Sequence, residues 1–258
     1  MNKLCIVIPA YNEEKRIGKT LERYSLFFEK ARKNKELDYE ILVVINNTKD
    51  KTESIVKSFS KKNKRIIYLN LIRGGKGYAV VSGFADALKR KNELIGFVDA
   101  DLSTSPEEYL KLVKNISSYD GIIASRYIKG AVLNPPQTIS RVISSRIYNF
   151  YIRALLFFPY SDTQCGAKLF KRKTLEVILP SLTMSHWAFD VDLLYISKLN
   201  GFKIKEFPTY WSDKTHSTIN FLTAGPMMAL AILRLRLLNS PLKGFIKLYD
   251  NLPFKIKF

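Results

Sequence analysis

Short apolar runs alternate with amphipathic stretches along the first 125 residues of the chain. The runs have the length and composition of buried strands, and the stretches between them repeat apolar residues at helical spacing. The expected strands cover residues 4–9, 40–45, 66–71, 94–98 and 121–124, and the expected helices cover residues 17–33, 51–61, 76–89 and 106–116. Strands that alternate with helices predict an α/β fold with a Rossmann-like, doubly wound and mostly parallel sheet.

The pattern changes after Tyr127, where Asn134-Pro135-Pro136 indicates a loop. Residues 139–158 then show helical spacing, with arginines around one side and an apolar face that carries Ile143, Ile147, Phe150, Ala154 and Phe158. Such a helix is typical either of a membrane interface or of an ordinary core, and the sequence favours neither.

A last helix over residues 221–238 is expected to be amphipathic or buried, because Pro226, Arg234 and Arg236 interrupt its apolar run. The chain has no uninterrupted apolar stretch of the roughly 18 residues that a transmembrane helix needs. We therefore expect a main α/β domain over residues 1–218 and a C-terminal amphipathic, basic, helical extension over residues 219–258. This extension should associate with a membrane surface without spanning it.

Basic residues outnumber acidic residues by 42 to 23, which gives a net charge of +19. This charge favours anionic partners such as nucleic acid, anionic membranes or phosphorylated substrates. Nucleic acid is not expected, because no recognition motif accompanies the charge. An apolar content of 47% excludes a disordered chain. Cys5 and Cys165 lack the spacing of a disulfide framework or a zinc site, and a reducing cytosol is the simplest compartment.

Two carboxylates follow the apolar run of residues 94–98, in the sequence Asp99-Ala100-Asp101. Residues two apart in an extended chain project to the same side, so Asp99 and Asp101 can reach one site. Carboxylates together with phosphate oxygens form the usual environment of Mg²⁺ or Mn²⁺. The pair predicts a metal site, although acidic pairs at strand ends are also common as caps and turns.

A glycine-rich segment, Arg73-Gly74-Gly75-Lys76-Gly77, lies at the same predicted edge of the sheet. Glycine allows the backbone to approach a ligand closely, and the neighbouring cations suit phosphate groups. The segment is not a Walker loop, because Gly77 follows Lys76 where Ser or Thr would be required. ATP hydrolysis of that type is therefore disfavoured.

Taken together, the motifs resemble glycosyltransferase family 2, and in particular its branch of polyprenyl-phosphate hexose synthases. The resemblance covers residues 4–218. It rests on an ordered set of short motifs: Pro9 to Glu14, Gly75-Lys76-Gly77, Asp99-Ala100-Asp101, Ser125-Arg126-Tyr127, residues 162–170 and residues 189–192. It implies a GT-A fold, a nucleotide-sugar donor (a UDP- or GDP-hexose), Mg²⁺ or Mn²⁺, and inversion at the anomeric carbon.

The resemblance also implies roles for particular residues. The donor nucleotide would be bound by Pro9, Tyr11, Asn12, Glu14, Asn46, Lys76 and Asp99, and the metal by Asp99 and Asp101. Phosphate or acceptor groups would be bound by Arg126, Arg141, Ser145, Gln164 and His216. The residues expected at the reacting centre are Asp101, Asp162, Asp190 and Arg126.

One departure from the family concerns the base of the donor. Members usually have Asp-Asp-Gly-Ser after the second strand, whereas this chain has Asn46-Asn47-Thr48, followed by Asp50. An asparagine carbonyl still accepts a hydrogen bond from a base N–H but carries no charge. The choice between uracil and guanine stays open.

The expected activity is transfer of glucose or mannose to dolichyl or another polyprenyl phosphate, by a peripheral protein at the cytoplasmic face of the membrane. A phosphate monoester is already anionic near neutral pH, with a second pKa of about 6, and so needs no strong base. Two alternatives remain open within the sequence: transfer to a saccharide or lipid-linked oligosaccharide, with Asp162 or Asp190 as base, and a metal-dependent phosphatase or nucleotidyltransferase, which leaves residues 162–170 unexplained.

Overall fold

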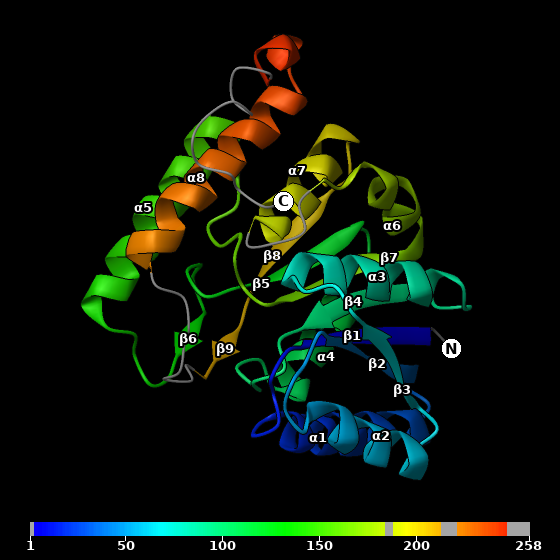
Figure 1. Cartoon of the computed structure of the whole chain (residues 1–258). Helices are drawn as coiled ribbons and strands as arrows, with labels where there is room; N and C mark the ends of the chain where they lie inside the picture. The colour runs from blue at the N-terminus through cyan, green and yellow to red at the C-terminus, as the bar shows by residue number, and fades with distance from the viewer. Residues whose placement is uncertain (1–2, 184–187, 213–220, 247–258) are drawn as a thin grey trace.

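A seven-stranded sheet forms the centre of the computed structural model, which describes residues 3–183, 188–212 and 221–246 (Figure 1). The strand order is β3-β2-β1-β4-β7-β5-β8. The strands are β1 (Lys3–Ala10), β2 (Asp38–Asn46), β3 (Ile66–Leu71), β4 (Leu94–Val98), β5 (Gly121–Ser125), β7 (Ala167–Lys171) and β8 (Ile204–Pro208). All neighbours pair in parallel except β7, which runs antiparallel to β4 and β5. The expected mostly parallel α/β fold is confirmed.

Helices cover both faces of this sheet (Figure 1). The helices are α1 (Ile17–Lys33), α2 (Thr52–Lys62), α3 (Lys76–Leu88), α4 (Pro106–Asn115), α6 (Arg172–Ile178) and α7 (Phe189–Leu199). Alternate residues of β1 point to opposite faces. Leu4 and Ile6 join the core formed with α1 and α4, and Cys5 and Val7 join the core formed with α3, α6 and α7.

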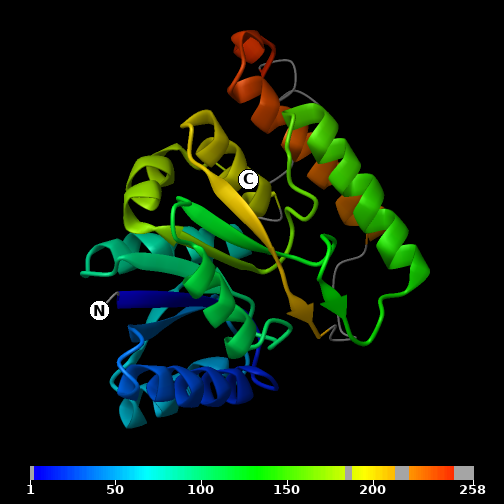
Figure 2. The same ribbon diagram turned by 180° about the vertical axis from the view of Figure 1, so that it is seen from behind.

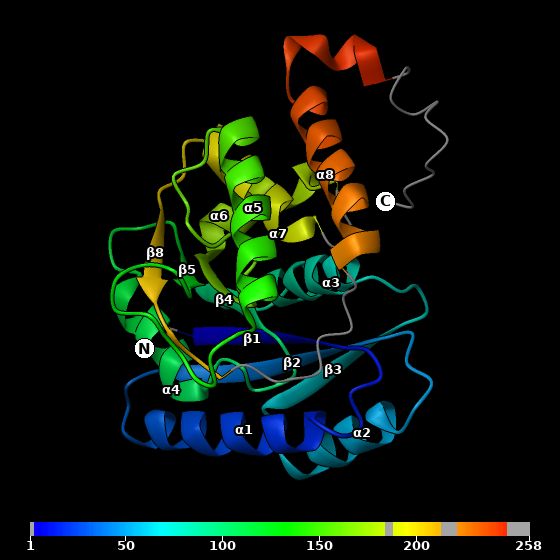
Figure 3. The same ribbon diagram turned by 90° about the vertical axis from the view of Figure 1, so that its left-hand side faces the viewer.

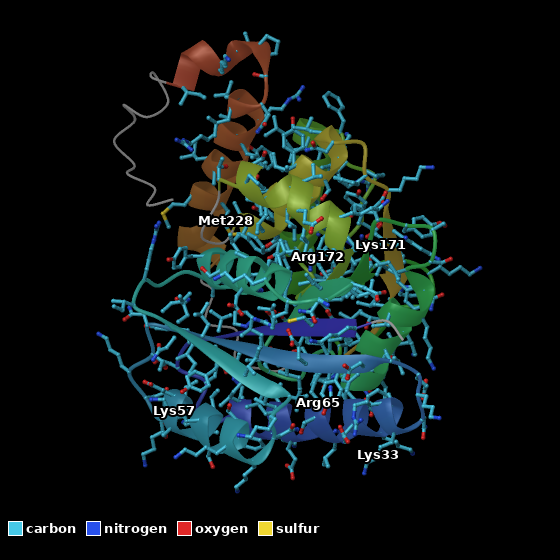
Figure 4. All side chains as sticks on the ribbon, turned by 90° about the vertical axis from the view of Figure 1, so that its right-hand side faces the viewer. Lys33, Lys57, Arg65, Lys171, Arg172 and Met228 are labelled. Carbon is cyan, nitrogen blue, oxygen red and sulfur yellow. The ribbon has the colours of Figure 1, made fainter. Side chains whose placement is uncertain are left out.

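Polar contacts also tie neighbouring helices of one layer together. The Arg172 guanidinium at the start of α6 donates to the carbonyl oxygens of Leu88 and Arg90, both at 2.6 Å. Figure 4 labels this side chain between the layers. These bonds tie the start of α6 to the end of α3.

Two further helices, α5 (Ile139–Leu156) and α8 (Phe221–Leu238), stand side by side against α7 (Figure 3). Their shared core includes Ile152, Leu156, Ile232 and Leu235. A short 3₁₀ helix, η2 (Pro241–Phe245), follows α8. Among the described residues, no helix has the length and apolar character needed to cross a bilayer. The expected boundary after residue 218 stays a prediction.

Helix α5 turns its predicted apolar face outward. Ile143, Ile147 and Phe150 are 53%, 65% and 73% exposed. The prediction that Phe158 belongs to this face was wrong. The helix ends at Leu156, and Phe158 is buried in the core beyond it. Phe157 takes a left-handed conformation, with φ of 53°, and so turns the chain at this point.

The antiparallel strand β7 was not expected as a strand, because residues 162–170 were predicted only as a motif. A small second sheet, β6 (Val132–Leu133) with β9 (Tyr210–Trp211), was not expected either, and Figure 2 shows it near the start of α5. Both features bring segments from the second half of the chain to the edge of the sheet where the site lies.

Candidate active site

The acidic pair after β4 lies beside the glycine-rich segment that opens α3. Lys76 Nζ is 2.7 Å from Asp99 Oδ1. The Ser103 N–H donates to Asp101 Oδ1 over 2.9 Å and so fixes the second carboxylate in the following turn. The structure therefore brings Lys76, Asp99 and Asp101 together, as expected for residues at the carboxyl edge of a parallel sheet.

The two carboxylates suit a divalent cation. They supply hard oxygen donors on one side of the site. Gly166, just before β7, leaves room for Asp99, because a Cβ on Gly166 would lie 1.9 Å from Asp99 Oδ2. Within the described residues, no group of three or more possible protein ligands forms a metal cluster. A cation here would therefore need further oxygens, such as those of a diphosphate, to complete its coordination.

Asp190 lies on the other side of Lys76, in the first turn of α7. Its Oδ1 is 2.5 Å from the Nζ of Lys168, a fully buried lysine on β7, and its Oδ2 is 4.0 Å from Lys76 Nζ. Burial raises the pKa of Asp99, and the neighbouring Lys76 acts against this effect. Lys168 belongs to the motif of residues 162–170. It was not expected as a site residue, because the sequence does not show which carboxylate it meets.

Asp162 and Arg126 form a buried ion pair. The guanidinium donates through Nε to Asp162 Oδ2 at 2.7 Å and through Nη2 to Oδ1 at 2.9 Å, and the Arg126 backbone N–H adds a bond of 3.0 Å. Burial acts to raise the pKa of Asp162, but the Arg126 charge and bonds outweigh it and hold that pKa below its usual range. Asp162 is thus a weak proton acceptor with both oxygens already bound.

The segment that carries Asp162 is braced from two directions. Glu206 on β8 accepts the backbone N–H groups of Ser161 and Asp162, both at 2.9 Å. Asn149 on α5 accepts from the Thr163 hydroxyl at 3.3 Å. Sequence reasoning missed Glu206 and Asn149, because neither belongs to a motif and each reaches its partner only through tertiary packing.

Asn12 and Glu14, both expected at the nucleotide, connect two loops instead of pointing freely into a site. Asn12 Oδ1 accepts the Lys49 N–H at 2.9 Å, and Glu14 Oε2 accepts the Lys51 N–H at 3.0 Å. In the other direction, the Glu14 N–H donates a hydrogen bond to Asp50 Oδ2 at 3.0 Å. These contacts shape the loops after β1 and β2, and any role of Asn12 and Glu14 at a nucleotide stays a prediction.

Asp50 is the main acceptor in this loop network. It binds the Thr52 N–H at 2.9 Å and the hydroxyls of Thr48 and Thr52 at 2.8 and 2.5 Å. Burial acts to raise the pKa of Asp50, but these bonds outweigh it and lower that pKa to about 2. The sequence placed Asp50 only in the departure from the family pattern, so its bracing role was missed.

Asn46, at the end of β2, retains an unused acceptor. The residue is 3% exposed, and within the described residues Oδ1 accepts no hydrogen bond. Pro9 lies half-buried near the end of β1, and Tyr11, two residues later, is 54% exposed. A carbonyl without a partner at the end of β2 and an exposed ring at the end of the neighbouring β1 are groups suited to a base that offers an N–H group.

Two of the remaining predicted contacts, Ser145 and Gln164, lie near Arg126. Its guanidinium carbon is 5.2 Å from the ring centroid of Trp211. The Ser145 and Tyr127 hydroxyls are 2.8 Å apart. The backbone N–H of Gln164 donates to Asp162 Oδ1 at 3.3 Å. The side-chain Nε2 of Gln164 is buried without a partner in the described part of the chain. His216 and the side chain of Arg141 lie outside the described residues.

Comparison with known proteins adds to this geometry. Residues 5–179 match the sequence model of Glycosyl transferase family 2. The chain is 34% identical over 215 residues to a dolichyl-phosphate beta-glucosyltransferase of Trichomonas vaginalis, covering 80% of this chain but 63% of that relative. It is 30% identical to the dolichyl-phosphate beta-glucosyltransferase of Dictyostelium discoideum, covering 90% of this chain and 73% of that protein.

Among solved structures, the chain is similar to glucosyl-3-phosphoglycerate synthase from Mycobacterium tuberculosis in complex with Mn²⁺, UDP and glucosyl-3-phosphoglycerate. The TM-score is 0.66 at 16% identity, and the match covers 92% of this chain and 79% of that one. The same enzyme has also been solved with Mg²⁺ and UDP. At this identity the likeness establishes a shared fold.

Proposed function

Because the chain belongs to glycosyltransferase family 2 and has a GT-A fold, we propose that it transfers glucose from UDP-glucose to a polyprenyl phosphate such as dolichyl phosphate. The glucosyl group and the lipid phosphate are supported by the names of the relatives. UDP is supported by the uridine nucleotide in the structural neighbour. The free Asn46 acceptor would receive a base N–H, which uracil and guanine both offer, so the choice of UDP rests on the neighbour.

The buried Arg126–Asp162 pair is the observation that favours a phosphate acceptor. A sugar hydroxyl would need a base, and Asp162 is poorly suited because Arg126 lowers its pKa and binds both of its oxygens. Asp190 is likewise engaged by Lys168. A phosphate monoester carries its own negative charge and can attack without a base.

The residues would then act mainly by position and charge. Asp99 and Asp101 would hold a Mg²⁺ or Mn²⁺ ion, which when bound supplies positive charge to the donor diphosphate. Arg126, with Nε and Nη2 held by Asp162, would present its remaining edge to a phosphate. Such preorganised charge lowers the barrier without reorganisation during the reaction.

Incubation with a panel of labelled nucleotide sugars and a short polyprenyl phosphate tests this proposal. We expect organic-extractable label from UDP-glucose at rates at least about tenfold above those from GDP-mannose, because discrimination of about 1.4 kcal/mol corresponds to a factor of ten. The matched control is the unphosphorylated polyprenol. Efficient transfer to a free saccharide, with none to the lipid phosphate, would favour the saccharide alternative.

The exposed face of α5 supports the further proposal that the protein acts at a membrane surface. Ile143, Ile147 and Phe150 lie outward on this helix with exposed Arg146 and Arg153 nearby. Apolar side chains can insert below lipid headgroups while arginines contact anionic lipid, and the net charge of +19 adds to this attraction. The membrane role of the C-terminal extension and the side of the membrane stay predictions.

Sedimentation with anionic liposomes tests the membrane proposal. The triple variant Ile143→Ser/Ile147→Ser/Phe150→Ser should bind at least about tenfold more weakly than wild type, because each large apolar side chain contributes roughly 1.5 kcal/mol or more when fully buried. The control Leu26→Ser/Val177→Ser removes exposed apolar side chains from α1 and α6 and should bind normally. Equal binding of wild type and triple variant would exclude this face as the docking surface.

A further inference from the structure

Four side chains of alternating charge form a row beside the sheet edge: Asp99, Lys76, Asp190 and Lys168. Lys76 Nζ is 2.7 Å from Asp99 Oδ1 and 4.0 Å from Asp190 Oδ2. Lys168 Nζ is 2.5 Å from Asp190 Oδ1. Lys76 therefore lies between the two carboxylates, and one of these is also an expected metal ligand.

The structure holds Lys76 and Asp99 in this arrangement. Lys76 is the first residue of α3, and it follows Gly75, whose φ of 123° sets the turn into the helix. Its Nζ lies 5.5 Å from the ring centroid of Phe97. A Cβ on Gly166 would lie 1.9 Å from Asp99 Oδ2, so the backbone just before β7 passes close to the second oxygen and limits movement of Asp99 in that direction. The pair is thus positioned by the start of α3 and by the segment just before β7.

This pairing has an electrostatic consequence for metal binding. A divalent cation bound to Asp99 would lie close to the Lys76 ammonium, which already contacts Asp99 Oδ1. Two cations at such short range repel strongly in a half-buried site. A diphosphate changes this balance, because it brings oxygens for the cation and a new anionic partner for Lys76.

We propose that Lys76 is an internal counter-cation that occupies the metal-binding carboxylate until a nucleoside diphosphate arrives. The metal ion then binds together with the diphosphate and only weakly before it. The inference rests on the proposed donor site and adds an order of binding to it. The Lys76 ammonium leaves Asp99 and contacts the diphosphate, and the metal ion then binds at Asp99.

Binding of Mn²⁺, followed by electron paramagnetic resonance of the free ion at pH 8, tests this order with and without UDP. In wild type, UDP should tighten Mn²⁺ binding at least about tenfold. In Lys76→Met, Mn²⁺ alone should bind at least about tenfold more tightly than to wild type, because the competing charge is gone. In EDTA, the same variant should bind UDP several-fold more weakly by calorimetry, because the diphosphate loses a cationic partner.

Two controls separate this effect from a general change in charge. Lys89→Met removes the same charge at a lysine whose side chain is 76% exposed and should behave as wild type. Lys76→Arg keeps the cation and should keep the order of binding. Lys76→Gln serves as a second neutral variant and retains a polar group beside Asp99.

The outcomes distinguish this inference from the proposed function. Unchanged affinity for Mn²⁺ alone in folded Lys76→Met and Lys76→Gln would overturn the role of Lys76 and leave the donor site standing. Absence of Mn²⁺ binding in every protein, even with UDP, would overturn the metal-dependent donor site and this inference with it.

Discussion

Replacement of Asp101 by alanine should reduce transfer by about a hundredfold to a thousandfold or more, the usual loss when a site loses a group that stabilises charge in the transition state. The change removes one of two carboxylates expected to hold the metal at the donor diphosphate. The variant should still fold, because Asp101 is half-buried and the change removes a hydrogen bond that its side chain accepts from the nearby Ser103 N–H. Initial rates with UDP-glucose across a Mn²⁺ titration, together with thermal unfolding, measure both effects.

Two further variants sharpen this prediction. Asp101→Asn keeps an oxygen that can accept the Ser103 N–H but removes the charge, so it should also be nearly inactive. Glu107→Ala removes an exposed carboxylate from the first turn of α4 and should retain normal rates. Turnover near the wild-type rate by folded Asp101→Ala in metal-depleted buffer would contradict the metal assignment.

Replacement of Asp162 by asparagine should lower the free energy of unfolding by about 3 kcal/mol or more, because removal of one partner from a buried ion pair leaves the other charge uncompensated. Arg126 is that partner, with a side chain 10% exposed beside a fully buried Asp162. Urea unfolding at pH 7 measures the loss. The control Glu176→Gln breaks the half-exposed pair with Arg172 and should cost about 1 kcal/mol or less.

The stability difference should depend on pH in a definite direction. The folded pKa of Asp162 is lowered, so its contribution is present above the unfolded pKa of about 3.9 and is lost as pH falls through the folded value. Wild type and Asp162→Asn should therefore converge in stability under acid conditions. A constant difference from pH 7 down to pH 2 would contradict the lowered pKa.

Activity of the same variant separates the two acceptor classes. With a phosphate acceptor, Asp162→Asn should retain residual transfer whose rate rises with ionisation of the acceptor near a pKa of about 6. Arg126→Lys should also retain partial activity, because a lysine keeps the charge but not the two-bond fork. Complete loss of transfer to an unphosphorylated acceptor in Asp162→Asn would instead identify Asp162 as a base and favour the saccharide alternative.

The sequence by itself determined the first half of the fold. Its five strands and four helices have strong local signals, since period-two and helical spacing depend only on neighbouring residues. It also determined that Asp99, Asp101 and Lys76 lie near one another, because the carboxyl ends of parallel strands meet at one edge. The long helix after residue 138 was also predicted from its helical spacing. The sequence did not decide whether the apolar face of this helix is buried or exposed.

Only the tertiary structure decided which charges pair. The antiparallel strand β7 enters the sheet between β4 and β5 and places Lys168 against Asp190. Asp162 meets Arg126 across 36 residues of sequence, and Glu206 reaches the Asp162 backbone across 44. A local sequence pattern indicates which positions are buried and which secondary structure they form. The partner of a buried charge depends on which distant segments pack together, and that is a property of the whole fold.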